Sequence, residues 1–377
     1  MPLRPVSNCA HRGFARYVAV ALAAFMLLSV TACNPNRGNR AGGGAIQLRG
    51  AGSTFIAPLM QKWTSEFNKT NPGVRADYQS TGSGAAIQGV QERTIDFGGS
   101  DAPLTDEAVI KSPDILHIPV VLGAVVVSHN LPGMSEPLRF SSDVLADIFL
   151  GNITRWDDAR IRADNPNVSL PATEIGVVHR SDGSGTTDIF TDYLSKISPQ
   201  WKTNVGRGTS VKWATGVGGK GNEGVTGVIT QTPNTIGYIE YIYAKQRNLP
   251  IVLIKNRAGN FIAPSPESVA NAATGALANT PEDLRVSVTD AEGAEAYPIS
   301  GYVYVLAYRE QSDAIKGKAL VDFLWWTIHN GIPYARNLQY TPLPEEIVRR
   351  AEAKINSISA SGRKLRQEPV AGSQEPE

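Results

Sequence analysis

The feature that most restricts the fold of this chain is an alternation of strand-like apolar runs with helical patterns. Residues 118–127 form one long apolar run, and residues 299–308 form another, rich in Val, Tyr and Leu. Such runs are typical of buried strands, and their alternation with helices indicates an α/β protein. About 170 residues separate the two runs, which is enough for a complete lobe. The sequence therefore predicts two lobes that two crossing segments join, with a cleft between them.

Three short turns share a composition of Gly, Ser and Thr, and each precedes an apolar pattern with helical spacing. They are residues 50–55, 80–85 and 181–187. A helix N-terminus offers unpaired N–H groups and a partial positive charge, while Gly allows close approach and Ser and Thr add hydroxyl donors. Three such ends that point at one place would surround a small oxyanion. The alternative is that these Ser and Thr side chains only cap helices, which they commonly do.

Asp101, in the segment 95–103, is the acidic candidate for the cleft. Composition alone leaves two interpretations open, because Asp101 either caps the helical stretch that begins near residue 105 or faces the ligand. A carboxylate repels an anion unless that anion carries a proton. A phosphate group still titrates at about pH 6 and keeps an O–H, whereas sulfate has none. In the cleft, Asp101 would accept a hydrogen bond from phosphate and repel sulfate.

Arg180 directly precedes the third turn. A guanidinium fork suits a tetrahedral oxyanion, and its hydrogen bonds are charge-assisted. The same fork can hold Asp101 or Asp182 in place. We therefore expect Arg180 to line the site and not to be an ordinary surface arginine.

Signals for enzymatic or metal chemistry are weak. The Gly-Ser-Gly triplets at residues 82–84 and 183–185 fall short of the Gly-x-Ser-x-Gly nucleophile motif. The histidines are scattered without the spacing of metal ligands. Residues 216–224 are rich in Gly but fail the phosphate-loop pattern, so we interpret them as a loop, one that could line the cleft. The sequence predicts neither a cofactor nor a metal site, and no catalytic residues.

Residues 1–32 are predicted to be a leader that is removed on export. Three arginines without any acidic residue precede a short apolar run, residues 18–30, which ends in small residues before Cys33. This order is typical of an export signal, and its end is similar to that of a bacterial lipoprotein, in which Cys33 would carry the lipid. The alternative is an ordinary secretory signal that is cut elsewhere. Residues 33–45 are then a flexible tether and residues 357–377 a disordered tail.

The charge of the chain is nearly balanced, with 36 basic and 35 acidic residues. Without the three leader arginines, 33 basic residues stand against 35 acidic ones. This argues against a nucleic-acid partner, which favours a basic face. An anion would have to be held by local groups instead of by the charge of the whole body. Because Cys9 leaves with the leader and Cys33 would be acylated, we expect no disulfide in the exported domain.

Taken together, these motifs closely resemble those of the phosphate-binding proteins of bacterial high-affinity phosphate ABC transporters. The resemblance spans roughly residues 47–346. No single motif is specific for that family, but their combination is. The matching segments are residues 50–55, 78–84, 95–103, 147–158, 180–186, 211–224 and 236–241.

The resemblance implies a two-lobed periplasmic-binding-protein fold of the type II kind, with two crossover segments and with phosphate held dry in the cleft. Lobe I would comprise residues 46–123 and 299–356, and lobe II residues 124–298. Phe55 would contribute its backbone N–H to the ligand. The family's contacts fall here on Ser53, Thr54, Phe55, Ser83, Asp101, Arg180, Asp182, Ser184, Gly185 and Thr186.

The resemblance further implies a lipid-anchored protein, in the periplasm or at the outer face of the cell membrane, that is not an enzyme. It would deliver inorganic phosphate to two transmembrane permease subunits driven by ATP-binding subunits. Three alternatives stay open: a binding protein for another tetrahedral oxyanion such as sulfate, an exported phosphatase-like hydrolase, or a phosphate sensor or surface protein without a transporter.

Overall fold

An eight-stranded mixed sheet runs through the described part of the chain, which is residues 44–134 and 136–366 of a computed structural model. The strand order is β2-β1-β3-β11-β4-β8-β6-β7. Parallel pairing joins β1 to β2 and β3, and likewise β6 to β7 and β8. The strands are β1 (Ile46–Gly52), β2 (Val74–Ser80), β3 (Phe97–Ser100), β4 (Ile115–Asn130), β6 (Gly176–Arg180), β7 (Val217–Gly219), β8 (Thr235–Glu240) and β11 (Ser300–Tyr308).

The two long strands β4 and β11 lie side by side at the centre of this sheet, and β4 continues from one half of it into the other. β11 lies antiparallel to β4 as far as Ala124, and β8 pairs with β4 from Val125 onward. Nearly every residue of β4 and β11 is buried, which is why both strands read as continuous apolar runs in the sequence. We call the strands up to Ala124 the first half of the sheet and those beyond it the second half. The change of partner lies at the predicted lobe boundary, which itself stays a prediction.

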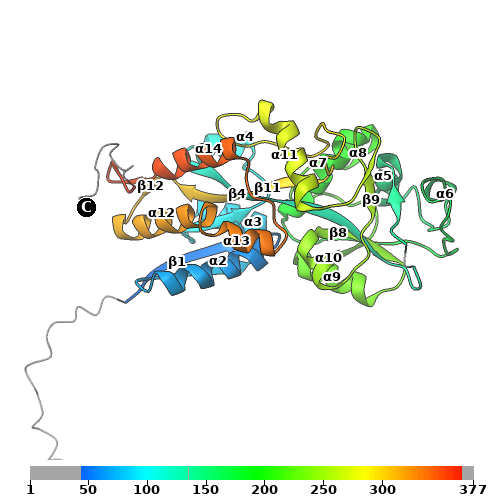
Figure 1. The fold of residues 1–377 in the computed structure, drawn as a ribbon, viewed down its shortest axis with the longest axis horizontal. Coiled ribbons are helices and arrows are strands. Elements are labelled where there is room, and N and C mark those ends of the chain that lie inside the picture. The colour runs from blue at the N-terminus through cyan, green and yellow to red at the C-terminus, as the bar shows by residue number, and fades with distance from the viewer. Residues whose placement is uncertain (1–43, 135, 367–377) are drawn as a thin grey trace, which may run out of the picture. The chain divides into compact units, whose positions relative to one another are not determined.

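Helices gather around each half of the sheet (Figure 1). Around the first half lie α2 (Ala57–Thr70), α3 (Ser83–Gln91), α4 (Asp106–Lys111), α12 (Ala314–Ile328), α13 (Ile332–Asn337) and α14 (Glu345–Asn356). Around the second lie α5 (Ser142–Leu150), α6 (Ala159–Asp164), α7 (Gly185–Ile197), α8 (Pro199–Asn204), α9 (Gly221–Gln231) and α10 (Tyr241–Gln246). The helix α11 (Pro266–Ala276), followed by the short 3₁₀ turn η1 (Leu277–Asn279), packs on β4 and β11. Within the ranges that the structure describes, no helix combines the length and the apolar character needed to span a bilayer.

The three predicted turn-and-helix units are all present. The first turn leads from β1 into α2, the second from β2 into α3, and the third from β6 into α7. Gly82, just before α3, has a φ of +96°, a conformation that side-chain-bearing residues rarely adopt. Each turn therefore stands at the carboxyl end of a parallel strand, where ligand sites of open α/β sheets form.

The prediction of a disordered tail from residue 357 is wrong for its first part. Two further small sheets exist, β5 (Arg139–Phe140) with β9 (Leu253–Lys255) and β10 (Phe261–Ile262), and β12 (Glu310–Gln311) with β13 (Ser359–Ala360) and β14 (Arg363–Lys364). Ile358 is fully buried, and the Leu365 N–H donates to its carbonyl at 3.0 Å. Burial of Ile358 and pairing with β12 stabilise a segment whose composition looked disordered. The rest of the predicted tail, and the predicted leader, Cys33 and most of the tether, lie outside the described residues.

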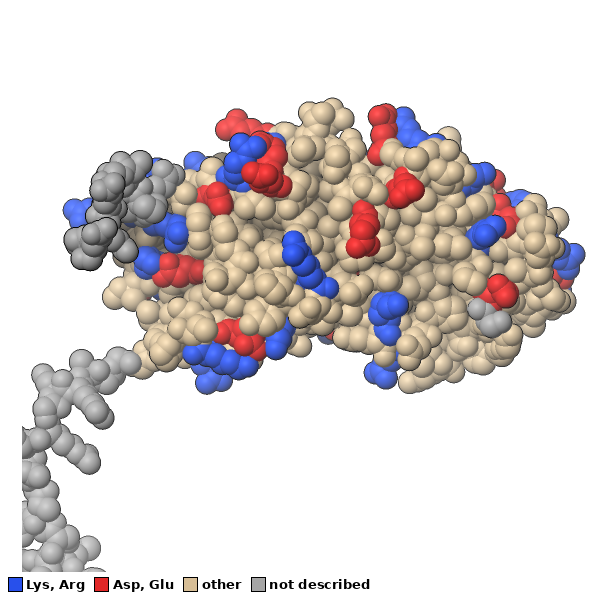
Figure 2. Space-filling model, in the orientation of Figure 1, with Lys and Arg blue, Asp and Glu red and all other residues tan. Residues whose placement is uncertain are grey.

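The surface carries charges of both signs. Figure 2 shows one face, on which Lys and Arg are interspersed with Asp and Glu among many uncharged residues. This distribution agrees with the near balance of 36 basic and 35 acidic residues. Recognition of a charged ligand by this body therefore depends on local groups.

Candidate functional site

The first and second turns, and the start of α7, meet at Asp101. The Ser53 hydroxyl of the first turn donates to Asp101 Oδ1. The Asp101 N–H donates to Ser83 Oγ of the second turn at 3.3 Å. Gly185, the first residue of α7, lies so close that a Cβ added there would be 2.6 Å from both Asp101 Oδ2 and Ser83 Oγ. The structure thus brings together residues that are up to 132 positions apart in the numbering of the chain.

The second and third turns also contact each other directly, across the two halves of the sheet. The Gly84 N–H donates to the Gly183 carbonyl at 2.9 Å. A Cβ on Gly82 would be 2.7 Å from Asp182 Oδ2. Both this close approach and the positive φ of residue 82 therefore require glycine. In the described structure, the turns of the two halves of the sheet are therefore in contact at the site.

Three tyrosine hydroxyls hold the first turn in place. The carbonyls of residues 53–55 accept hydrogen bonds from Tyr78, Tyr243 and Tyr340, at 3.0, 2.6 and 2.6 Å respectively. Because these carbonyls are occupied, the turn cannot rotate its peptide groups without losing buried hydrogen bonds. The Phe55 N–H donates to Ser53 Oγ at 3.0 Å. Its predicted donation to a ligand stays a prediction.

Asn222 joins the first turn to the third, although no motif in the sequence indicated this residue. Its backbone N–H and side-chain amide donate to Thr54 Oγ1 at 3.1 and 2.7 Å. The amide also lies 3.1 Å from Thr186 Oγ1, to which it donates. The interpretation of residues 216–224 as a loop is wrong, because they form β7, a turn and the start of α9. A Gly with a φ of +71° precedes Asn222, so this is a fourth turn of the same kind, and its strand of only three residues hid the pattern.

Arg180 is buried at the end of β6, with 3% of its surface exposed. Its Nε and Nη2 donate to the two oxygens of Asp182 at 2.8 and 2.6 Å, and Nη1 donates to Thr186 Oγ1 at 3.2 Å. Burial raises the pKa of Asp182, but the hydrogen bonds and charge of Arg180 outweigh it and hold that pKa below its ordinary value. Asp182 is thus an ionised partner that orients the guanidinium toward the site.

The capping alternative for Asp101 is wrong. Thr105 caps α4, since its hydroxyl accepts from the Ala108 N–H at 3.2 Å. Asp101 is 3% exposed, and among the described residues its Oδ2 has no hydrogen-bond partner. Burial raises the pKa of Asp101 from 3.8 to about 7, against the hydrogen bond from Ser53 and the charge of Arg180. This buried oxygen can therefore accept a hydrogen bond from a ligand.

The capping alternative for the three turns holds only in the third. Ser184 caps α7, because its hydroxyl accepts from the Thr187 N–H at 3.1 Å. Across the described helices, α2 and α3 have no side-chain cap at their starts, so Ser53 and Thr54 are free of that role. The Ser184 carbonyl accepts from the Asp188 N–H at 3.1 Å. At the start of α7, the N–H groups of Gly185 and Thr186 therefore have no acceptor among the described residues and can donate to a ligand.

The predicted contact residues therefore lie together, and the arrangement suits a small anion that carries a proton. Hydroxyls, helix N–H groups and a guanidinium supply donors, and Asp101 supplies one acceptor. In the residues that the structure describes, no group of three or more His, Cys, Asp or Glu side chains could hold a metal ion.

Comparison with known proteins shows which families this chain is similar to. Residues 34–328 match the family model described as PBP superfamily domain. The phosphate-binding protein PstS of Xylella fastidiosa (strain 9a5c) is 41% identical over 344 residues, which covers 86% of this chain and 94% of that protein.

Two solved structures have the same fold. The phosphate-binding protein from Stenotrophomonas maltophilia superposes with a TM-score of 0.63 at 20% identity, covering 81% of this chain and 93% of that one. An ABC-type phosphate transport receptor from Vibrio cholerae does so with a TM-score of 0.53 at 16% identity, covering 79% and 100%. These likenesses confirm the predicted two-lobed α/β periplasmic-binding-protein fold.

Proposed function

Because this chain belongs to the PstS family of phosphate-binding proteins, within the PBP superfamily, we propose that it captures inorganic phosphate and passes it to an ABC importer. As a member of this family it is a solute-binding protein and not an enzyme. The site at Asp101 is where the ligand binds. Two transmembrane permease subunits, driven by ATP-binding subunits, would receive it.

The phosphate would be held by groups from both halves of the sheet. Ser53, Thr54 and Ser83 offer hydroxyls, and Phe55 a backbone N–H. Arg180 offers its guanidinium, which Asp182 orients. From the third turn, Ser184 and Thr186 add their hydroxyls, and Gly185 and Thr186 add helix N–H groups of α7.

The observation that carries this proposal is the free oxygen of Asp101. In the described structure Asp101 Oδ2 is buried without a partner, beside the N-terminus of α7. Near neutral pH, phosphate can donate an O–H to that oxygen, whereas sulfate would place two negative charges against it without a hydrogen bond. The same carboxylate thus favours phosphate and disfavours sulfate.

The leader and Cys33 would determine where the protein is located. Residues 1–32 would direct export, and Cys33 would carry a lipid that holds the protein at the outer face of the cell membrane or in the periplasm. Metabolic labelling with a fatty-acid analogue tests this directly. We expect label on the wild-type protein and none on Cys33→Ser, and label on both would contradict the assignment.

Isothermal titration calorimetry of the purified protein with phosphate and with sulfate at pH 8 tests the proposed function. We expect phosphate to bind at one site per chain and sulfate at least 100-fold more weakly, since a buried ionised group without a partner costs about 3 kcal/mol or more. Equal affinities would favour a general oxyanion-binding protein. Hydrolysis of a phosphoester by the purified protein would favour the hydrolase alternative.

A further inference from the structure

A buried ion-pair cluster lies directly behind the site, on the helix whose N-terminus contributes to it. Both oxygens of Asp188, on α7, accept from Arg207, at 3.0 Å from Nε and 2.7 Å from Nη2. Asp192, one helical turn further on, accepts from Nη1 of the same arginine at 2.8 Å. Asp188 and Asp192 are 7% and 6% exposed. The proposed function leaves this cluster without a role.

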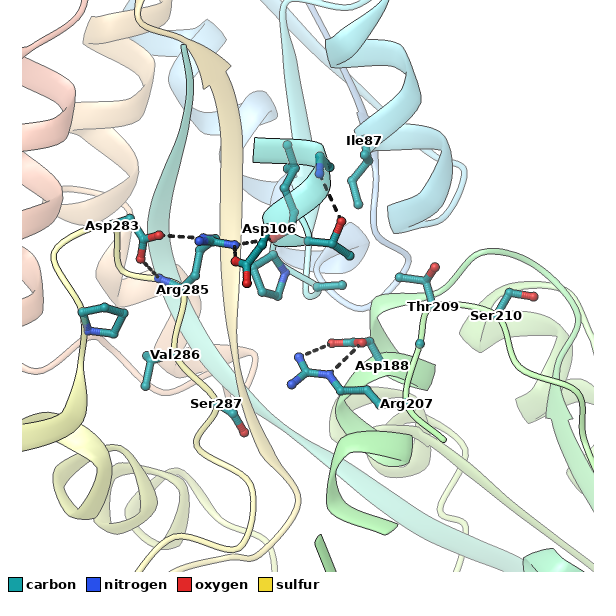
Figure 3. A pocket seen from close by; sticks show the side chains of 17 residues that line it. Ile87, Asp106, Asp188, Arg207, Thr209, Ser210, Asp283, Arg285, Val286 and Ser287 are labelled. Atoms are coloured by element: carbon teal, nitrogen blue, oxygen red, sulfur yellow. Dashed lines mark hydrogen bonds and ion pairs between the residues drawn. The ribbon is translucent and has the colours of Figure 1, made fainter. Parts of the chain in front are cut away.

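Asp188 and Asp101 line the same small cavity. The cavity measures about 20 Å³, and Asp192 and Arg207 also line it. A single water needs roughly 10–15 Å³ of such space, so little more than one water fits between these groups. Figure 3 shows Asp188 and Arg207 paired in the wall of an adjoining, larger pocket, which Arg285 and Asp106 also line. Asp188 therefore lies between the ligand site and a pocket that opens toward solvent.

The charge of Asp188 is less fully neutralised than that of Asp192, so it can affect the ionisation of Asp101. Arg207 pairs with both carboxylates, and Lys196 lies 3.3 Å from Asp192 Oδ2 as a second cation. Asp188 therefore shares one guanidinium, whereas Asp192 has a cation besides that guanidinium. Asp192 has additional partners, since Ser287 and Thr289 both donate to its Oδ2 at 2.5 Å. Like charges across a cavity of this size repel strongly, because few water molecules screen them.

We propose that Asp188, held by Arg207, is a further specificity-determining residue of this site, which sets the pH above which anions without a proton are excluded. The proposal rests on the proposed function and deepens it. Asp188 need not touch the ligand. It acts through Asp101, whose negative charge it opposes.

The groups around Asp101 support this reading. Arg180 favours the ionised form of Asp101, and Asp188 disfavours it. Three further titratable groups lie near Asp101, and burial raises the pKa of each well above its usual value, which favours the neutral form; they are Glu240, Tyr78 and Tyr340. Asp188 is thus an acidic neighbour held in an ion pair by Arg207, and its charge opposes the ionisation of Asp101.

The consequence is a selectivity that depends on pH. Phosphate brings the proton that the site requires. Sulfate brings none, so each sulfate bound requires Asp101 to take up one proton from solvent. Sulfate affinity should therefore be constant at low pH and fall about tenfold per pH unit above the midpoint at which Asp101 ionises. Removal of the Asp188 charge makes Asp101 ionise more readily and moves that midpoint to lower pH.

The test compares Asp188→Asn with wild type and with Asp192→Asn, by titration with phosphate and with sulfate from pH 5.5 to 9. Asp192→Asn is the matched control, because it also removes one carboxylate from Arg207 but acts one helical turn further from Asp101. For Asp188→Asn we expect a lower sulfate midpoint and a phosphate-to-sulfate affinity ratio at pH 8 that is roughly three to ten times that of wild type. For Asp192→Asn we expect a change of less than about twofold in that ratio.

Two results would overturn the inference: a midpoint for Asp188→Asn equal to that of wild type, or an equal displacement for Asp192→Asn. A merely structural role for Asp188 would lower stability without moving the midpoint. Asp188→Ser removes the same charge and must move the midpoint in the same direction, so the test survives the misfolding of one variant. Failure of wild type to bind phosphate would refute the proposed function instead, and a wild type that binds phosphate beside an unmoved variant would refute only the role of Asp188.

Discussion

The substitution Asp101→Asn should weaken selectivity and at the same time stabilise the ligand-free protein above neutral pH. Burial raises the pKa of this carboxyl from 3.8 to about 7. Below pH 3.8 the folded and unfolded states both hold the proton, so Asp101 has no effect on stability there. As the pH rises toward 7, the unfolded chain loses the proton and the folded protein keeps it on a buried group that resists ionisation. Stability therefore falls over this range and stays low above pH 7.

The magnitude follows from the two ends of that range. Ionisation at about pH 7 instead of 3.8 costs the folded state about 4 kcal/mol at 1.4 kcal/mol per pH unit. Asparagine has no charge and can still accept from the Ser53 hydroxyl. We expect Asp101→Asn to be more stable than wild type by up to about 4 kcal/mol at pH 8, with the unpaired amide reducing that gain. At pH 4 the two proteins should differ by less than about 1 kcal/mol.

Urea denaturation of extensively dialysed, phosphate-free protein at pH 4 and pH 8 measures this difference. Asp77→Asn is the control, because Asp77 is exposed on β2 and its substitution should change stability by no more than about 0.5 kcal/mol at either pH. An Asp101→Asn variant that is no more stable than wild type at pH 8 would refute the reasoning, as would an equal gain at both pH values. In the same samples, sulfate affinity should rise toward that of phosphate, since an amide can donate to an anion that carries no proton.

Three further substitutions test the rest of the site. Arg180→Ala should weaken phosphate binding by about 2–3 kcal/mol in calorimetry; adding Asp182→Ala should recover stability lost through the unpaired carboxylate but not affinity, and recovery of both would place Arg180 outside the binding contacts. Gly185→Ala should reduce phosphate affinity at least tenfold, because its Cβ would lie 2.6 Å from a carboxylate oxygen of the site, whereas Gly227→Ala on α9, with nothing within 4 Å, should bind as wild type. Tyr340→Phe should lower the free energy of unfolding by about 1–3 kcal/mol, since it leaves a buried carbonyl of the first turn without its 2.6 Å hydrogen bond, and an unchanged urea midpoint would contradict this.

Local patterns were sufficient for much of the fold. The two apolar runs became β4 and β11, because strands covered on both faces need apolar residues at nearly every position. The three Gly- and Ser-rich turns precede α2, α3 and α7, since turn chemistry and helical periodicity are both encoded within a few residues. The resemblance implied that these turns converge, but only the tertiary structure shows the convergence directly.

The missed features depend on contacts between distant residues. Asn222 binds Thr54 across 168 positions, and Tyr340 binds the Phe55 carbonyl across 285, so neither leaves a local signal. The pairing of Asp188 with Arg207 joins α7 to a loop that has no periodicity. The strands after residue 357 formed through burial of Ile358, which composition over 20 residues conceals.

The most direct test of the central claim is a crystal structure of the protein with phosphate bound. The account predicts one phosphate oxygen about 2.5–2.7 Å from Asp101 Oδ2, the length of a hydrogen bond from an O–H to a carboxylate, with the remaining oxygens facing Arg180 and the first turn of α7. A phosphate bound elsewhere, or one whose oxygens all lie beyond hydrogen-bonding distance of Asp101, would contradict it.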